Sequence, residues 1–285
     1  MNPPVASTVE ALLRAGVRLL EGSSASPRLD TEVLLAQALG WDRSRLFMHR
    51  DQLVPPAIAA RFLRDIGARQ SGRPLAHISG QRGFWTLDLA VTADVLVPRP
   101  ETELLVERAL ARLPAGQPAR VLDLGTGSGA VALAIAVERP RAQVLATDLS
   151  AAALAVARAN AQRIGAGNLR LAEGDWFAAA SGGRFDVVVS NPPYIADAEW
   201  ATVDAGLAFE PRCALAAGAD GLDALRIIIA RAPEHLDDGG WLLLEHGATQ
   251  GPAVRSLMEG AGFHRLATAT DLAGHPRVTE GQRRA

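Results

Sequence analysis

The sequence has very little cysteine. Cys213 is the single cysteine among 285 residues, which excludes an intrachain disulfide and any cysteine-rich zinc site. One cysteine is compatible with a reducing compartment, so we expect a cytoplasmic protein. The six histidines show no metal-ligand spacing, and no metal is expected.

An excess of charge of one sign is also missing. The 29 lysines and arginines nearly balance 31 aspartates and glutamates, giving a net charge of −2 and a pI near 6.3. Without a global positive field, stable nucleic-acid binding is not expected.

Long apolar runs are absent too. Ala130–Val137, among the longest, is far shorter than the roughly 20 residues that cross a bilayer. The N-terminus has no basic region leading into an apolar stretch. We therefore expect neither a membrane span nor a secretory signal.

The pattern of apolar residues divides the chain. Up to about Gly72 they recur at helical spacing between turn residues, which predicts a small helical domain of about four helices. Phe84–Val91 and Asp94–Val97 are expected to form a hairpin around the residues between them. The predicted divisions are a helical domain at residues 1–78, a β-hairpin linker at 79–98 and a catalytic domain at 99–285.

The rest of the chain alternates between strand and helix patterns, which predicts an α/β fold with a doubly wound, mostly parallel sheet. The seven expected strands are residues 120–124, 143–147, 168–172, 185–190, 241–244, 264–269 and 277–282. The helices expected among them are residues 130–138, 151–164, 223–231 and 249–261.

A glycine-rich turn follows the first of these strands. Its residues are Gly125, Thr126, Gly127, Ser128 and Gly129. Backbone there can approach a ligand closely because glycine carries no Cβ. Together with Ala130, the turn fits the dinucleotide fingerprint, and Asp148 ends the next strand at the spacing of a ribose-binding acid, so NAD is one candidate.

S-adenosylmethionine is the other candidate, because its ribose hydroxyls can also donate to one carboxylate. The turn would then contact its methionine portion and Asp148 its ribose. Trp176, after the third strand, offers a π face for the adenine, although it could equally cap the core.

Asn191-Pro192-Pro193-Tyr194 follows a buried strand and must end it, since two prolines remove two N–H donors. The Asn191 side-chain oxygen and the Pro192 carbonyl can each accept one N–H of a planar NH2 group, while Tyr194 covers its face. The alternative is a turn that only closes the strand, with Tyr194 as its packing plug. Ligands of such sheets bind outside the carboxyl ends of the strands, which favours the functional interpretation.

The glycine turn, Asp148 and Asn191–Tyr194, in that order, resemble the class I S-adenosylmethionine methyltransferases, with a Rossmann-like domain, that modify planar nitrogens. Four further segments make the resemblance closer: Arg82–Trp85, Val97–Glu103, Phe209–Pro211 and Leu243–Gly247 are similar to those of the release factor glutamine-N5 methyltransferases of the HemK/PrmC type. The resemblance spans nearly the whole chain.

That resemblance implies methyl transfer from S-adenosylmethionine, giving S-adenosylhomocysteine, to the glutamine of the Gly-Gly-Gln loop in class I peptide chain release factors. It assigns Asn191, Pro192 and Tyr194 as catalytic, with Pro193 also binding substrate and Asn191 also contacting the cofactor. The helical domain would recognise the substrate.

Two other acceptors remain open. Related enzymes methylate a glutamine of a ribosomal protein, but they usually have Pro-Arg-Ser where this chain has Pro98-Arg99-Pro100. An adenine amino-methyltransferase would use the same Asn191–Tyr194 clamp on a flipped base, against the electrostatics of the chain. Arg99 itself could neutralise a ligand carboxylate or pair with Glu101 or Glu103.

Overall fold

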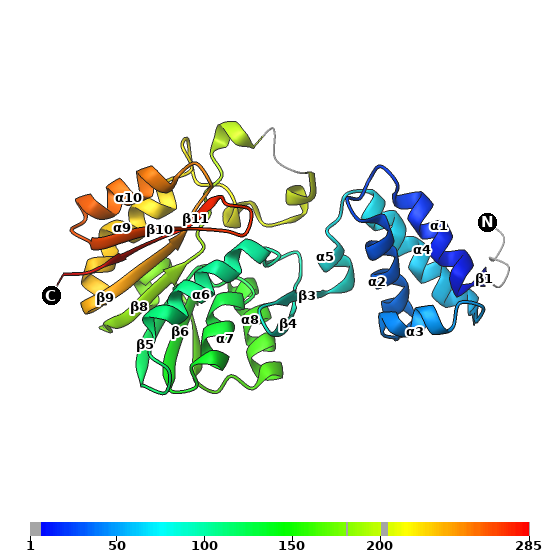
Figure 1. Cartoon of the computed structure of the whole chain (residues 1–285), viewed down its shortest axis with the longest axis horizontal. Helices are drawn as coiled ribbons and strands as arrows, with labels where there is room; N and C mark the ends of the chain where they lie inside the picture. The colour runs from blue at the N-terminus through cyan, green and yellow to red at the C-terminus, as the bar shows by residue number, and fades with distance from the viewer. Residues whose placement is uncertain (1–6, 181, 201–204, 285) are drawn as a thin grey trace. The chain divides into compact units, whose positions relative to one another are not determined.

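The computed structural model describes residues 7–180, 182–200 and 205–284 (Figure 1). Contacts divide the chain into two compact units. The first contains the described residues of Met1–Gln81 and Asp204–Phe209, and the second those of Arg82–Val203 and Glu210–Ala285.

The first unit is a helical bundle with its own core. Its helices are α1 (Val9–Leu20), α2 (Pro27–Leu39), α3 (Arg43–Met48), α4 (Pro56–Gln70) and α5 (Leu75–Ser79), with a short pairing of β1 (Ser7–Thr8) and β2 (Leu53–Val54). Thr8 caps α1 by accepting the N–H of Ala11. A Cβ on Gly16 would lie 2.6 Å from Thr31 Cγ2 and 2.9 Å from Phe62 Cζ, so this glycine lets α1 pack closely.

The hairpin differs from its prediction. It consists of β3 (Gln81–Phe84) and β4 (Leu87–Ala90) and turns at Trp85, whereas 94–97 is not a strand. Trp85 adopts a positive φ of 55°, and its N–H donates to Glu103 Oε1 at 2.9 Å. The Glu103 carboxylate thus holds a turn one residue after the expected strand begins at Phe84, and the alternation of polar and apolar residues alone cannot reveal this contact.

The second unit is built on a seven-stranded sheet in the order β10-β11-β9-β8-β5-β6-β7. The strands are β5 (Ala119–Leu124), β6 (Ala142–Asp148), β7 (Leu169–Glu173), β8 (Phe185–Ser190), β9 (Leu236–Glu245), β10 (His264–Thr270) and β11 (Pro276–Gln282). Only β11 runs against the others, because it pairs antiparallel with both of its neighbours. The predicted doubly wound, mostly parallel sheet is confirmed.

Helices cover both faces of this sheet (Figure 1). They are α6 (Glu103–Arg112), α7 (Ala130–Glu138), α8 (Ala151–Ile164), α9 (Asp223–His235) and α10 (Gly251–Gly260). The second unit also has the short 3-10 helices η1 (Pro100–Thr102), η2 (Trp176–Ala180), η3 (Asp197–Glu199) and η5 (Arg212–Ala214), whereas η4 (Ala205–Phe209) belongs to the first unit. Val187 and Val189 pack in the core with α6 and α7, and Val188 in the core with α9 and α10. This alternation follows from the two-residue period of a strand.

The sheet order fixes where a ligand can bind. β5 pairs with β6 on one side and with β8 on the other, so the chain reverses its winding direction between β5 and β8. Open α/β sheets bind ligands outside the carboxyl ends of their strands at such a switch point. No described helix is both long enough and apolar enough to cross a membrane.

Candidate active site

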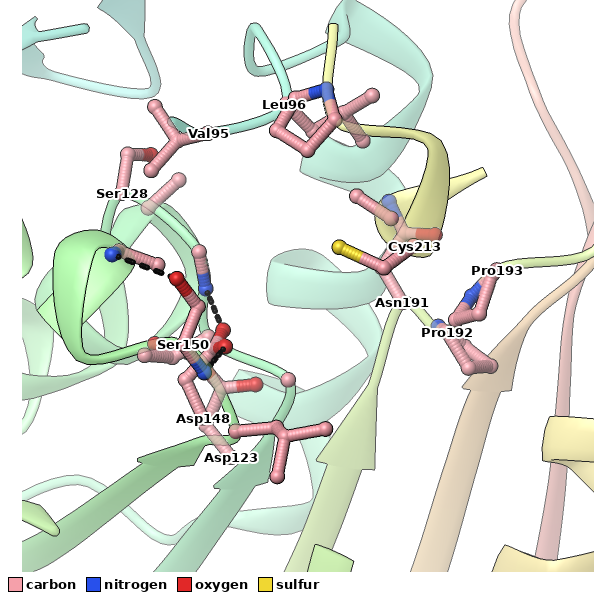
Figure 2. A pocket seen from close by; sticks show the side chains of 18 of the residues that line it. Val95, Leu96, Asp123, Ser128, Asp148, Ser150, Asn191, Pro192, Pro193 and Cys213 are labelled. Atoms are coloured by element: carbon pink, nitrogen blue, oxygen red, sulfur yellow. Dashed lines mark hydrogen bonds between the residues drawn. The ribbon is translucent and has the colours of Figure 1, made fainter. Parts of the chain in front are cut away.

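One cavity of about 250 Å³ lies at the carboxyl ends of β5, β6 and β8. Predicted cofactor and substrate residues line it: Gly125, Thr126, Gly127, Ser128, Asp148, Trp176, Asn191, Pro192 and Pro193. Figure 2 shows Asp123, Asp148 and Ser150 on one side of the cavity and Asn191, Pro192, Pro193 and Cys213 on the other. The two motifs that are far apart in the sequence therefore face one space.

Backbone donors hold the carboxylate of Asp148. Gly127 N–H donates to Oδ2 and Ser150 N–H to Oδ1, both at 2.8 Å (Figure 2). A carboxylate offers about four acceptor positions, so each oxygen keeps one for a ligand hydroxyl. Gly127 has a φ of +55°, a backbone conformation that side chains with a Cβ rarely adopt. The turn and the acid thus form one preorganised half-site.

A second carboxyl group lies under this half-site. Asp123 is buried, lines the cavity and accepts the Thr126 hydroxyl at Oδ2, 2.7 Å away. Burial raises the pKa of Asp123 to about 7, against the hydrogen bond from Thr126.

Trp176 and Gly129 take different positions relative to the cavity. Trp176 lines it with a positive φ of 47°, and a Cβ on Gly125 would lie 3.6 Å from Trp176 Cζ3. Gly129 does not line it. A Cβ there would lie 3.1 Å from Leu133 Cδ1 and 3.3 Å from Ala157 Cβ, so Gly129 serves the packing of α7 against α8.

The Asn191 side chain is oriented by a neighbouring hydroxyl. Asn191 Nδ2 donates to Thr102 Oγ1 at 3.1 Å, and both residues line the cavity. Among the described residues, no donor contacts Asn191 Oδ1. That oxygen is therefore available as an acceptor for a ligand N–H.

Tyr194 lies outside the set of residues that line the cavity. It is half-buried, and its carbonyl accepts the Gln250 side-chain N–H at 3.0 Å. Burial, with Glu245 nearby, raises the pKa of the Tyr194 hydroxyl to about 12. This placement matches a packing plug better than a wall of the cavity, and a wall role for Tyr194 stays a prediction.

Sequence reasoning missed two segments that complete the cavity wall. Asp94, Val95, Leu96, Pro98, Arg99 and Thr102 belong to one, and Pro211, Cys213 and Ala214 to the other. Glu210 joins them, because it accepts the Val97 N–H at 3.0 Å and pairs with Arg99. Of the two roles left open for Arg99, the salt bridge is present, but its partner is Glu210 and not Glu101 or Glu103. The signal was present in the Pro-Arg-Pro and Phe-Glu-Pro segments, but spacing cannot pair residues 111 positions apart.

Within the described ranges, no group of three or more His, Cys, Asp and Glu side chains is arranged to hold a metal ion. Cys213, the single cysteine, is exposed and reaches the cavity beside Asn191 (Figure 2).

Two family models match the chain. The PrmC N-terminal domain matches residues 10–80, and the methyltransferase small domain matches residues 100–209. A solved methyltransferase from Pyrococcus furiosus shares the fold, with a TM-score of 0.53, 20% identity and coverage of 70% of this chain and 91% of that one.

Curated relatives match over almost their whole length. The release factor glutamine methyltransferase of Xylella fastidiosa strain Temecula1 is 52% identical over 272 residues, covering 95% of this chain and 97% of the relative. The Pseudomonas aeruginosa protein of the same name is 50% identical over 259 residues, covering 91% and 94%. These matches decide for a methyltransferase and against a NAD-dependent oxidoreductase. The resemblance inferred from the motifs is confirmed, and the chain belongs to the release factor glutamine methyltransferase family.

Proposed function

We propose that this enzyme transfers a methyl group from S-adenosylmethionine to the side-chain amide nitrogen of the glutamine in the Gly-Gly-Gln motif of class I peptide chain release factors. S-adenosylhomocysteine is the second product. The observation that carries the proposal is that Asn191 and Pro192 face the same cavity as Asp148 and Gly127. An acceptor for a planar amide and a carboxylate for a ribose thus open onto one space.

The residues around the cavity fit the cofactor. Asp148 keeps two acceptor positions for ribose hydroxyls after binding Gly127 and Ser150. Trp176 offers an aromatic face on the same side, and the backbone from Gly125 to Ser128 borders the remaining space for the methionine portion. When bound, S-adenosylmethionine supplies a sulfonium methyl group, which is already a good electrophile.

The work left to the protein is to prepare the nitrogen. A carboxamide nitrogen is a poor nucleophile because its lone pair is delocalised into the carbonyl. Asn191 Oδ1 and the Pro192 carbonyl accept its two N–H groups, hold the NH2 group in line for transfer and favour the positive charge that develops on nitrogen. Positioning of this kind contributes about 7–11 kcal/mol in the best intramolecular cases. Neither a strong base nor a metal is needed, since attack makes the nitrogen acidic enough to lose its proton to water.

The methyl acceptor in this proposal is a side chain of another protein, which the enzyme must also recognise. The division of the chain into domains serves this recognition. Residues 99–285 carry the methyl transfer, residues 79–98 link the domains, and residues 1–78 recognise the release factor away from its glutamine. Exposed apolar side chains in the helical unit support this role, with Met48 70% exposed and Leu53 60% exposed. Recognition takes place in the cytoplasm, and neither a nucleic acid nor a membrane takes part.

Recognition by the helical unit has its own test. Met48→Glu should raise the KM for intact release factor several-fold and leave cofactor affinity unchanged, because it places charge on the recognition surface. Leu272→Glu, at a fully exposed leucine of the other unit, is the matched control. If both variants have the same KM for release factor as the unchanged enzyme, the helical unit does not recognise the release factor through this surface.

The reaction itself is tested with four acceptors and S-adenosylmethionine labelled in the methyl group. They are a class I release factor, the same factor with glutamic acid in place of the Gly-Gly-Gln glutamine, ribosomal protein and duplex DNA. We expect label only in the unchanged release factor. Label in the substituted factor, in ribosomal protein alone or in DNA would contradict the proposal.

A further inference from the structure

A buried carboxyl group lies beside Asn191 at the carboxyl ends of β8 and β9, and it does not line the cavity. Glu245 is the last residue of β9 and is only 1% exposed. Its Oε2 atom has no hydrogen-bond partner in the described part of the chain. A buried ionisable group with an unpartnered oxygen costs free energy, so its presence beside the site calls for an explanation.

Glu245 neighbours the two side chains that shape the acceptor. Ser190 pairs with Leu244 in the parallel register of β8 and β9, so the next residues, Asn191 and Glu245, leave the sheet side by side. Thr102 and Asn191 are both able to donate toward the Glu245 carboxyl group, and they hold its pKa lower than burial alone would. Asn191 Nδ2 in turn donates to Thr102 Oγ1 at 3.1 Å. The three side chains therefore form one cluster of polar groups, with Glu245 buried in the core and Thr102 and Asn191 lining the cavity.

The chemistry of the cluster decides which end of the Asn191 amide faces the cavity. If the Asn191 amide rotated by 180°, its NH2 group and its oxygen would exchange places. The Asn191 NH2 group would then face the NH2 group of the substrate, and two donors cannot hydrogen-bond to each other. An ionised carboxylate only accepts hydrogen bonds. Thr102 accepts from the NH2 end of Asn191. A carboxylate at Glu245 favours the same end on its side, which leaves Oδ1 as the end for the substrate.

We propose that Glu245 is a positioning residue, which acts through Asn191 and Thr102 to hold Asn191 Oδ1 toward the substrate amide. The inference rests on the proposed function, since it assumes that an N–H of the substrate is to be accepted. It adds a third residue to an acceptor site in which only Asn191 and Pro192 touch the substrate.

The charges around Glu245 give this role a pH signature. Burial raises the pKa of Glu245 to about 7, and the nearby donor side chains of Thr102 and Asn191 and the charge of Arg277 oppose this rise. Glu101 and Tyr194 are the other titratable groups that face it. Above that pKa the carboxylate polarises Asn191 and strengthens Oδ1 as an acceptor, so kcat should rise with pH through about 7.

Kinetics of four variants test the proposal. Glu245→Gln and Thr102→Val should lower kcat about tenfold to a hundredfold with little change in either KM, because both release the Asn191 amide. Thr102→Ser keeps the hydroxyl and should retain most of kcat. Glu280→Gln is the matched control: Glu280 is also 1% exposed, but it pairs with Arg108 and Arg112 away from the cavity, so kcat should not change.

The pH profile separates positioning from simple support of the fold. The rise of kcat near pH 7 should persist in Glu280→Gln and disappear in Glu245→Gln. The proposal is overturned if Glu245→Gln and Thr102→Val keep their kcat, or if they lose it while the rise near pH 7 remains and Thr102→Ser is equally impaired. Thr102→Val decides the matter if Glu245→Gln does not fold.

A readout without substrate distinguishes this inference from the proposed function. The side-chain NH2 resonance of Asn191, identified by its absence in Asn191→Ala, should titrate near pH 7 in the unchanged enzyme and not in Glu245→Gln. If the Asn191 resonance titrates in the same way in the unchanged enzyme and in Glu245→Gln, the inference is contradicted even if the release factor is methylated. Failure to methylate the release factor, with the titration present, contradicts only the proposed function.

Discussion

Asp148 Oδ2 accepts the backbone N–H of Gly127 at 2.8 Å, which joins the acid at the end of β6 to the glycine turn after β5. Ser150 N–H binds the other carboxylate oxygen at the same distance. The carboxylate is thus fixed from both sides before any ligand arrives. Part of the ordering that cofactor binding requires is already present in the fold.

Asp148→Asn should weaken S-adenosylmethionine binding about tenfold to a hundredfold, because an amide cannot accept hydrogen bonds at both ends. A charge-assisted hydrogen bond contributes about 1.5–3 kcal/mol, which corresponds to that range. Calorimetry on the folded variant measures the change. An affinity within twofold of the unchanged enzyme would show that Asp148 does not bind the cofactor.

Asn191→Ala should lower kcat about a hundredfold or more and leave cofactor affinity nearly unchanged, because it removes an acceptor aimed at developing charge. Asn168→Ala is the matched control. The Asn168 amide donates to the carbonyls of Ala136, Arg139 and Ala142 at the opposite end of the sheet, so its loss should cost stability and not kcat. Turnover retained by Asn191→Ala would refute its catalytic role.

Asn160→Asp should destabilise the glycine turn. The Asn160 side chain is fully buried and donates to the carbonyls of Ala90 and Ser128, at 3.0 and 2.9 Å. An aspartate cannot donate to either when ionised, so we expect a loss of about 1–3 kcal/mol in the free energy of unfolding. Denaturant titration checks this, and weaker cofactor binding should accompany it. An unchanged free energy of unfolding would mean that the hydrogen bonds of Asn160 to Ala90 and Ser128 do not stabilise the glycine turn.

Asp123 should make stability fall as pH rises toward neutrality. Burial raises its pKa from 3.8 to about 7, so the folded state favours the protonated carboxyl group. That contribution is complete below the unfolded pKa and is lost as pH rises through about 7. The melting temperature of the unchanged enzyme minus that of Asp123→Asn should therefore decrease from pH 5 to pH 7.5. A difference that increases over this range would contradict the assignment.

Most of the fold could be predicted from the sequence, because burial dictates its patterns. The predicted strand 185–190 and helices 130–138 and 151–164 agree with β8, α7 and α8 at both ends. The hairpin could not be placed correctly, because its turn depends on Glu103, 18 residues beyond Trp85. The described part of the helical unit has five α-helices where about four were expected, and the short α5, Leu75–Ser79, is the additional one.

Only those parts of the site that lie in recognisable sequence motifs could be predicted. The glycine turn and Asn191 are recognisable because their residue types are unusual after a strand. Glu245 also ends a buried strand, but only its position beside Asn191 and Thr102 indicates a role. Gly129 and Tyr194 belong to motifs whose other members line the cavity, and motif membership cannot tell a packing residue from a lining one.

The most direct measurement is fragmentation mass spectrometry of a class I release factor after incubation with this enzyme and S-adenosylmethionine. The account predicts one added methyl group, on the side-chain amide of the glutamine in the Gly-Gly-Gln motif, and none with Asn191→Ala at the same enzyme concentration. A methyl group on another residue, or an unmodified factor when calorimetry shows the cofactor bound, would contradict it.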